Sequence, residues 1–392
     1  GVDFNVIADR YIKEYYTDAE GLGIGKATVH PRATETMDAI IDIVQKLLDN
    51  GHAYLAPNGD VYFRTKSDPD YGKLCHQPME ELQAGARISV GEQKEDPMDF
   101  AVWKAAKPGE PAWDTPWGSK GRPGWHIECS AMVNKYLGPT IDIHSGGLDL
   151  IFPHHENEIA QSECANGCTF AHYWLHNGFL TIDNEKMSKS KGNFFMVRDA
   201  AKEFGYETIR MFMLSAHYRT PLNYSAESLE MNKASLARLY EARSNMEFRI
   251  GKAEGDAMTA EESAKMEALA AYKQKFIDAM DDDLNTADAL SAIFELTREI
   301  NAYMGAHQDA TKAFLTAAHA LFMELTGVLN IVQKHEDASA DPDAEKIEAL
   351  IAQRAAAKKE KNFAEADRIR DELATMGVTI KDTRQGTQWS RA

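Results

Sequence analysis

The stretch IDIHSGGLDLIFPHHENEIAQSE, residues 141–163, passes from a short apolar run through paired glycines into a predicted helix. Pro153 suits the first helical position, where its missing N–H leaves no hydrogen bond unmade. The wider segment from Gly124 to Phe195 also alternates short apolar runs with helices, as a parallel sheet covered by helices does. This part of the chain is therefore predicted to be an α/β domain.

The helix in this stretch carries two candidate metal ligands. His154 and Glu158 stand four residues apart, so both side chains lie on one helix face. A neutral imidazole and a carboxylate at this spacing supply half of a metal site. The alternative is a polar first turn whose glutamates complement the helix dipole, and the pair alone favours that alternative. A third ligand nearby would favour a metal site over this alternative.

Composition limits the kind of protein. The chain has 392 residues, 44% apolar and 27% charged, which predicts two to four ordinary globular domains with no membrane span. Its net charge of −18 argues against indiscriminate binding to phosphate backbones, although residues 345–392 carry ten Lys/Arg against eight Asp/Glu. Four cysteines form no disulfide scaffold and predict a reducing cytoplasm: Cys75, Cys129, Cys164 and Cys168.

Local patterns predict the domain order. Helices are expected at about 4–16 and 34–50, and Asn58-Gly59 between strand-like runs predicts a hairpin. The expected domains are a catalytic domain with an inserted, irregular lobe, a helical connecting region, a helical bundle, an acidic linker and a small helix-plus-strand domain. Their ranges are 1–200 with the lobe at about 52–123, then 201–254, 255–333, 334–344 and 345–392.

A second motif, EKMSKSKGNFF at 185–195, follows a strand-like run. A cationic loop rich in donors suits a polyphosphate whose leaving oxygens gain charge. Most basic runs are simply solvated loops. The ordered pentapeptide Lys-Met-Ser-Lys-Ser at 186–190 is much less common, and it resembles the signature of class I aminoacyl-tRNA synthetases.

Further blocks extend this resemblance over nearly the whole chain. They stand in the order and spacing of the cysteinyl-tRNA synthetase family: PMDFAVWK at 97–104, GRPGWHIECSAM at 121–132, the stretch 141–163, HYRTPLNYS at 217–225 and QGTQW at 385–389. The resemblance implies a Rossmann-like α/β catalytic domain, incomplete at its N-terminus. An α-helical bundle and a small α+β anticodon-binding domain are expected to follow it.

The resemblance also implies roles for individual residues. Cys129 matches the third ligand of a zinc ion, beside His154 and Glu158, and this zinc would bind the sulfur of substrate cysteine. His155 and Glu156 are expected to support the site rather than bind the metal. The remaining matches are the amino-acid pocket, the adenosine contacts and the lysines that act on ATP and pyrophosphate: Trp125 and His144; Gly146, Gly147 and Asp149; Lys186 and Lys189.

The implied reaction joins L-cysteine to tRNA(Cys) in two steps. Cysteine and ATP, which arrives with Mg²⁺, form cysteinyl-adenylate, and the acyl group then passes to the terminal ribose of the tRNA. A monomer is expected. In the tail, Trp389 is a candidate for stacking on an unpaired base, with Arg384, Gln388 and Arg391 as further contacts.

One departure from the family pattern bears on activity. No His-x-Gly-His motif occurs in the sequence, so this chain alone is expected to be weak or inactive in adenylate formation. Three alternatives stay open: a cysteine ligase acting on an amino-sugar, a noncatalytic tRNA-binding remnant, and a zinc hydrolase. The basic tail from Glu345 argues against the first, the Cys129, His154 and Glu158 set against the second, and the lysine loop against the third.

Overall fold

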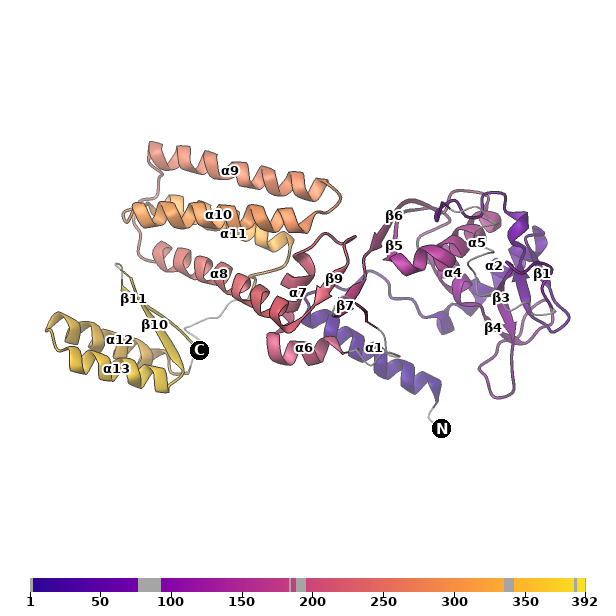
Figure 1. The fold of residues 1–392 in the computed structure, drawn as a ribbon, viewed down its shortest axis with the longest axis horizontal. Coiled ribbons are helices and arrows are strands. Elements are labelled where there is room, and N and C mark those ends of the chain that lie inside the picture. Colours follow the sequence, from indigo (N-terminus) through magenta and orange to yellow (C-terminus); the bar gives the residue numbers. More distant parts are fainter. Residues whose placement is uncertain are drawn as a thin grey trace. The chain divides into compact units, whose positions relative to one another are not determined.

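The fold of the chain divides into two units (Figure 1). The structure is a computed structural model, and it describes residues 3–76, 93–182, 185–187, 195–334, 342–383 and 386–391. The first unit holds Gly25–Met187 and Tyr218–Asn223. The second holds Gly1–Ile24, Ser188–His217 and Tyr224–Ala392. Within the described ranges, no helix is long and apolar enough to cross a bilayer.

The first unit contains an antiparallel sheet in the order β1-β2-β3-β4. Its strands are Ala53–Leu55, Val61–Phe63, Phe100–Ala105 and Gly121–Pro123. β1 pairs with β2 across the Asn58-Gly59 turn, which confirms the predicted hairpin. Gly59 has φ 87°, a left-handed conformation that favours glycine in such a turn. The inserted lobe is thus more regular than predicted, because β3 and β4 extend the hairpin.

Helix α2 (Met37–Asp49) covers the apolar core of this sheet. Its buried residues recur every three or four positions, as an amphipathic helix requires: Met37, Ile40, Ile43, Val44 and Leu47. A 3₁₀ turn, Ala33–Glu35, precedes the helix, and Gly51 at φ 78° follows it. The helix predicted at 34–50 is therefore confirmed, with a start three residues later.

The same unit contains the predicted parallel pair. β5 (Ile141–Gly147) lies parallel to β6 (Ala171–Asn177), and α5 (Glu156–Asn166) connects them. Helix α4 (Trp125–Tyr136) precedes β5 and packs on α5. Two short turns, Leu148–Leu150 and Ile151–His155, join β5 to α5. In the second turn Phe152 is extended, and the helical path begins at Pro153. In this strand–helix–strand unit, the carboxyl end of β5 leads through the two turns to the start of α5.

A small sheet in the order β8-β7-β9 lies close to the lysine motif in sequence. Its strands are Leu180–Ile182 (β7), Glu185–Lys186 (β8) and Leu222–Tyr224 (β9). Thr181 of β7 pairs with Lys186, the first lysine of the motif. Residues 188–194, which include Lys189, lie outside the described residues.

The second unit is largely helical. Its helices before the tail are α1 (Phe4–Gly21), α6 (Val197–Phe204), α7 (Tyr206–Leu214), α8 (Ala226–Ile250), α9 (Ala260–Asp281), α10 (Thr286–Ala306) and α11 (Lys312–Val328). Helices α8 to α11 share one apolar core, in which Leu239, Ile293 and Phe314 are fully buried. Arg198 of α6 forms ion pairs with Glu14 and Asp18 of α1, at 2.9 Å each, and these pairs connect the two helices.

The C-terminal part of this unit has a small core of its own. Helices α12 (Ala344–Lys359) and α13 (Phe363–Thr375) pack against a hairpin of β10 (Val378–Thr383) and β11 (Gly386–Arg391). The strand β11 was not predicted. Trp389 of β11 packs on this core and donates its indole N–H to Glu348 at 2.7 Å, so its ring has a structural role. Most of the predicted linker, residues 335–341, lies outside the described residues.

Candidate metal centre

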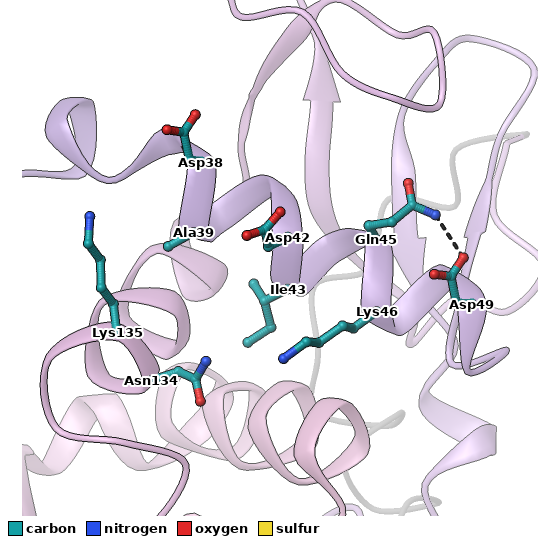
Figure 2. Close-up of a pocket in the computed structure, with 9 residues that line it drawn as sticks. All are labelled: Asp38, Ala39, Asp42, Ile43, Gln45, Lys46, Asp49, Asn134 and Lys135. Atoms are coloured by element: carbon teal, nitrogen blue, oxygen red, sulfur yellow. Dashed lines mark hydrogen bonds between the residues drawn. The ribbon is translucent and has the colours of Figure 1, made fainter.

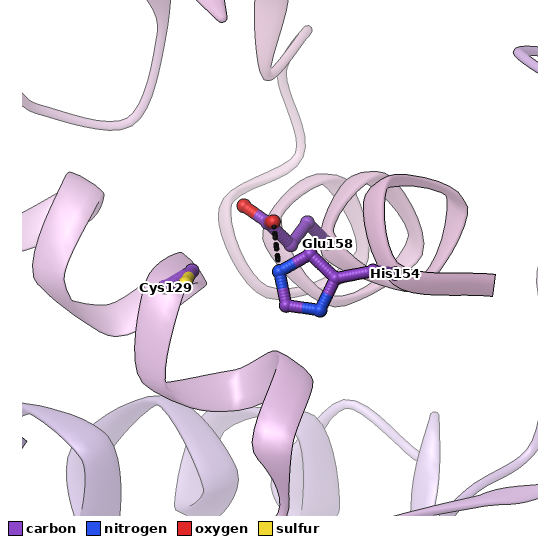
Figure 3. A group of neighbouring side chains, drawn as sticks. All are labelled: Cys129, His154 and Glu158. Carbon is purple, nitrogen blue, oxygen red and sulfur yellow. Dashed lines mark ion pairs between the residues drawn. The ribbon is translucent and has the colours of Figure 1, made fainter. Parts of the chain in front are cut away.

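Helices α4 and α5 bring three predicted ligands together (Figure 3). Cys129 lies in α4, His154 lies in the turn before α5, and Glu158 lies one helical turn after it. The potential ligand atoms of these residues all lie within 4.8 Å of one another. His154 and Glu158 are buried, at 5% and 1% exposure. One thiol, one imidazole and one carboxylate, drawn from two packed helices, form a donor set that suits zinc.

The carboxylate of Glu158 has two unlike oxygens. Oε2 lies 2.8 Å from Nε2 of His144, in hydrogen-bonding geometry. Oε1 lies 2.7 Å from Nε2 of His154, but without that geometry, so it has no hydrogen-bond partner among the described residues. Burial alone would raise the pKa of Glu158, but its contacts with His144 and His154 outweigh burial and lower the pKa. Glu158 is therefore an ionised, buried carboxylate, and one of its oxygens accepts no hydrogen bond from the described residues, as suits a cation ligand.

His154 is oriented by a residue that sequence reasoning missed. Its Nδ1 lies 2.9 Å from Nδ1 of His126, the second residue of α4. Burial, followed by the nearby His154, lowers the pKa of His126 to about 4, so His126 is neutral and can accept a hydrogen bond. With Nδ1 of His154 as the donor, Nε2 turns a lone pair toward Glu158. A bound cation would stabilise that arrangement, which fits the usual pattern for a metal-ligating histidine.

Cys129 needs a cation to become a ligand. Burial raises the pKa of its thiol to about 12, and the charges of Glu158 and Glu128 act in the same direction. Without a metal this sulfur therefore carries its proton at neutral pH. A zinc ion would displace that proton and hold the thiolate, because a metal-bound thiol is deprotonated. The donor set and the Glu158 oxygen that accepts no hydrogen bond from the described residues thus both fit zinc.

Imidazole and indole rings line the neighbouring space. His144, His155 and Glu158 form a second close group of possible ligands, which shares Glu158 with the first. His155 Nδ1 lies 2.8 Å from Nε2 of His176, and burial lowers the pKa of His155 to about 4. Trp174 stacks with His176 at 6.1 Å between ring centroids. Both residues come from β6, where residues two apart share a face, and that spacing in AHYWLHN was the available signal.

The other predicted residues that the structure describes lie in α4, in β5, in the 3₁₀ turn after β5 and in β8. Trp125 opens α4, and its ring lies 4.5 Å from that of His154 while 61% of the residue is exposed. Gly146 and Gly147 end β5, and Asp149 follows in the 3₁₀ turn. A Cβ atom at Gly146 would lie 2.7 Å from the His155 ring, so packing requires glycine there. Lys186 lies in β8, whereas Lys189 lies outside the described residues.

A separate pocket lies between α2 and α4 (Figure 2). It has a volume of about 490 Å³ and contains none of the predicted site residues. Seven polar or charged residues and two apolar ones line it: Asp38, Asp42, Gln45, Lys46, Asp49, Asn134 and Lys135, with Ala39 and Ile43. This pocket adds nothing to the chemistry of the metal centre.

Comparison with known families agrees with these observations. The model of the class I (C) tRNA synthetase catalytic domain matches residues 1–234. The DALR domain matches residues 275–333, and the cysteinyl-tRNA ligase anticodon binding domain matches residues 343–389. The first and third matches agree with the family that the sequence blocks resemble.

Individual relatives and a solved structure are also similar. A cysteine–tRNA ligase of Clostridioides difficile is 54% identical over 391 residues, which are 100% of this chain and 83% of the relative. A cysteine–tRNA ligase of Symbiobacterium thermophilum is 53% identical over 394 residues, again 100% and 83%. In structure, Mycobacterium tuberculosis methionyl-tRNA synthetase in complex with methionyl-adenylate matches 86% of this chain and 83% of its own, at a TM-score of 0.64 and 16% identity.

The solved structure supports the fold alone, and it confirms the predicted class of a Rossmann-like catalytic domain followed by helical domains. The curated relatives support a stronger conclusion than the fold, because more than half of their aligned residues are identical over the whole length of this chain. Taken with the catalytic-domain match, they show that the chain belongs to the cysteine–tRNA ligase family of class I aminoacyl-tRNA synthetases.

Proposed function

We propose that this chain ligates L-cysteine to tRNA(Cys) through an ATP-dependent cysteinyl-adenylate, and that zinc held by Cys129, His154 and Glu158 selects the substrate thiol. The observation that carries the proposal is the convergence of these three residues around a buried carboxylate oxygen that has no hydrogen-bond partner in the part of the chain that the structure describes. Three protein ligands leave a coordination position open. Zinc in such a site would bind the cysteine sulfur as thiolate and prefer it to the hydroxyl of serine.

The other residues of the site would bind and orient the substrates. Trp125 and His144 lie beside the ligands, where they can exclude water from the amino-acid side chain. Gly146, Gly147 and Asp149 stand at the carboxyl end of β5, the usual position of a nucleotide in a parallel sheet.

Lys186 and Lys189 are proposed to stabilise the charge that develops on the leaving pyrophosphate of ATP, which arrives with Mg²⁺. The curated relatives are ligases that act on tRNA, and the anticodon-binding match at residues 343–389 favours tRNA over an amino-sugar as the acceptor.

Zinc content and thiol preference test the proposal directly. The purified chain is expected to hold one zinc ion by elemental analysis, and cysteine is expected to bind it more tightly than serine by calorimetry. Replacing Cys129 with alanine should remove the zinc and the preference together. Cys168→Ala is the matched control, because this thiol is exposed. A zinc-free wild-type chain, or a Cys129→Ala chain that still prefers cysteine, would contradict the proposal.

Cysteine-dependent exchange of pyrophosphate into ATP tests adenylate formation. The zinc measurement does not depend on the rate of this exchange. Loss of cysteine-dependent exchange on replacing Lys186 with alanine, at unchanged zinc content, would support the assigned division of roles. Unchanged exchange in that variant would contradict the role of Lys186.

A further inference from the structure

A short segment of the inserted lobe is fastened to the far side of α5. We call residues 71–75 the strap. Glu156, the first residue of α5, is 1% exposed, and its carboxylate accepts three backbone N–H groups from the strap. Oε1 accepts from Gly72 at 2.9 Å, and Oε2 accepts from Leu74 at 3.1 Å and Cys75 at 3.0 Å. A buried carboxylate is costly unless hydrogen bonds satisfy it, so these contacts hold the strap firmly.

Two neighbours of Glu156 along α5 reinforce the connection. Asn157 Oδ1 accepts the hydroxyl proton of Tyr71 at 2.6 Å, and both residues are buried. Glu163 forms an ion pair with Lys73 at 2.5 Å. Burial raises the pKa of Tyr71 far above its usual value, so the phenol remains a donor. The strap therefore contacts α5 along two turns of the helix.

The position of Glu156 in α5 gives these contacts a consequence for the metal centre. Residues two apart point to nearly opposite sides of a helix, so Glu156 faces away from His154 and Glu158. Other contacts hold α5 elsewhere: Gln161 donates to Ser130 of α4 at 2.9 Å, and His155 contacts His176 of β6. The strap thus supplies a further restraint on α5, which contains Glu158 and directly follows the turn that contains His154.

We propose that Glu156 is a positioning residue that couples the strap to zinc binding: its hydrogen bonds to Gly72, Leu74 and Cys75 set the rotation of the first turn of α5, and with it the placement of His154 and Glu158. The inference rests on the proposed zinc site. It adds a positioning residue outside the ligand set, together with a contact that joins the inserted lobe to the site.

Glu156→Gln is the sharpest variant, because it keeps the size of the side chain. Glutamine turns an N–H₂ group toward N–H donors, so it breaks at least one of the strap contacts. Asp99→Asn is the matched control. Asp99 is also 1% exposed and accepts the backbone N–H groups of Thr65 at 3.0 Å and Asp96 at 3.1 Å, but no described contact of its carboxylate reaches α5. Both variants therefore damage a buried carboxylate in the same unit, and one of them damages the connection to α5.

Zinc affinity is measured on the full chain by competition with a chromophoric chelator. Glu156→Gln is expected to weaken zinc binding about 10- to 100-fold, the range found when partners of metal ligands are removed. Asp99→Asn is expected to change it less than twofold at a similar loss of thermal stability. Equal effects of the two variants on zinc affinity would overturn the proposal, because they would show a general loss of stability.

Amide hydrogen exchange gives a readout that needs no enzymatic activity. In the wild-type chain, adding zinc is expected to slow exchange in the peptide spanning residues 71–76, because the strap and the ligands share α5. In Glu156→Gln this peptide should exchange faster and no longer respond to zinc. If zinc does not change the exchange rate of this peptide in the wild-type chain, the proposed coupling is wrong.

Tyr71→Phe keeps the proposal testable if Glu156→Gln does not fold. This variant removes the hydrogen bond to Asn157 alone and should weaken zinc binding by about threefold. The failure of each proposal is distinct. A wild-type chain without zinc would refute the proposed function, whereas a zinc-binding chain whose affinity ignores Glu156 and Tyr71 would refute this inference only.

Discussion

Helices α5 and α11 are both deeply buried, but they bury opposite kinds of side chain. From Glu156 to Ser162 every residue of α5 is buried, and five of these seven are polar: Glu156, Asn157, Glu158, Gln161 and Ser162. The buried residues of α11 are nearly all apolar: Phe314, Leu315, Ala318, Leu321, Phe322, Leu325 and Thr326. Apolar burial stabilises a fold at any position that packs well, whereas polar burial requires a partner for each group.

The hydrogen-bond partners of α5 explain how this helix can hold so many buried polar groups. Its charged and amide groups are matched by backbone N–H groups, by imidazoles and by Ser130 of α4. Four buried polar atoms of α5 have no hydrogen-bond partner among the described residues: Glu158 Oε1, Gln161 Oε1, Ser162 Oγ and Asn166 Nδ2. Of these residues, Glu158 belongs to the group of candidate ligands. In α11, by contrast, the hydroxyl of Thr326 donates a hydrogen bond to the carbonyl oxygen of Phe322 within the same helix. The comparison predicts that damage to α11 affects stability alone, and that damage around α5 affects zinc binding.

The largest expected effect on stability comes from the bundle core. Phe314→Ala should lower the free energy of unfolding of the bundle by about 4 kcal/mol, the usual cost of truncating a fully buried phenylalanine. Val328→Ala is the control on the same helix, because Val328 is 59% exposed, and it should cost less than about 0.5 kcal/mol. Hydrogen exchange of α11 in increasing denaturant measures both. A loss of zinc affinity in Phe314→Ala would contradict the prediction that damage to α11 affects stability alone.

The tail offers a buried charge far in sequence from the metal ligands. Arg354 is 6% exposed and bonds both oxygens of Asp382, at 2.7 and 2.9 Å. Asp382→Asn should lower tail stability by about 2 kcal/mol, below the cost for a fully buried pair because the Asp382 side chain is 46% exposed. Thermal unfolding of the tail measures this change, and zinc affinity should not alter.

The same pair predicts a pH dependence. Arg354, then Lys358, holds the pKa of Asp382 well below its usual value. The pair therefore contributes fully above about pH 4, the ordinary aspartate pKa, and its contribution falls as pH drops further toward the lowered pKa. Tail stability in the wild type should fall with acid over that window, and Asp382→Asn should flatten the fall. An unchanged acid profile in the variant would show that Asp382 is not responsible.

The smallest expected effect lies beside the metal centre itself. His126→Ala removes the partner of His154 Nδ1 and should weaken zinc binding about tenfold, because the ligand ring loses its orientation. His172→Ala, an exposed histidine on β6, should leave the affinity unchanged. Chelator competition checks both variants. Equal affinity in His126→Ala and the wild type would mean that the Trp125 ring and α5 suffice to orient His154.

Much of the local structure follows from short-range patterns. The apolar spacing of α2 and the Asn58-Gly59 turn each predicted an element that the structure contains, since neighbours within about four residues determine such elements. The spacing of His154 and Glu158 likewise predicted two candidate ligands on one face, and the structure brings them close together. The strand β11 was missed, because its residues GTQWSR carry little strand pattern and depend on pairing with β10.

By itself, the sequence determined the family, several helices and the pairing of His154 with Glu158 as candidate ligands, because these depend on motifs and on periodicity within single segments. Tertiary structure alone brought Cys129 within reach of that pair, and it set His126, His176 and Glu156 around it. Gly72 and Glu156 stand 84 residues apart, and no local rule relates them. Such contacts form only when packed helices and strands close the chain on itself, which is why the support of the site had to be seen in three dimensions.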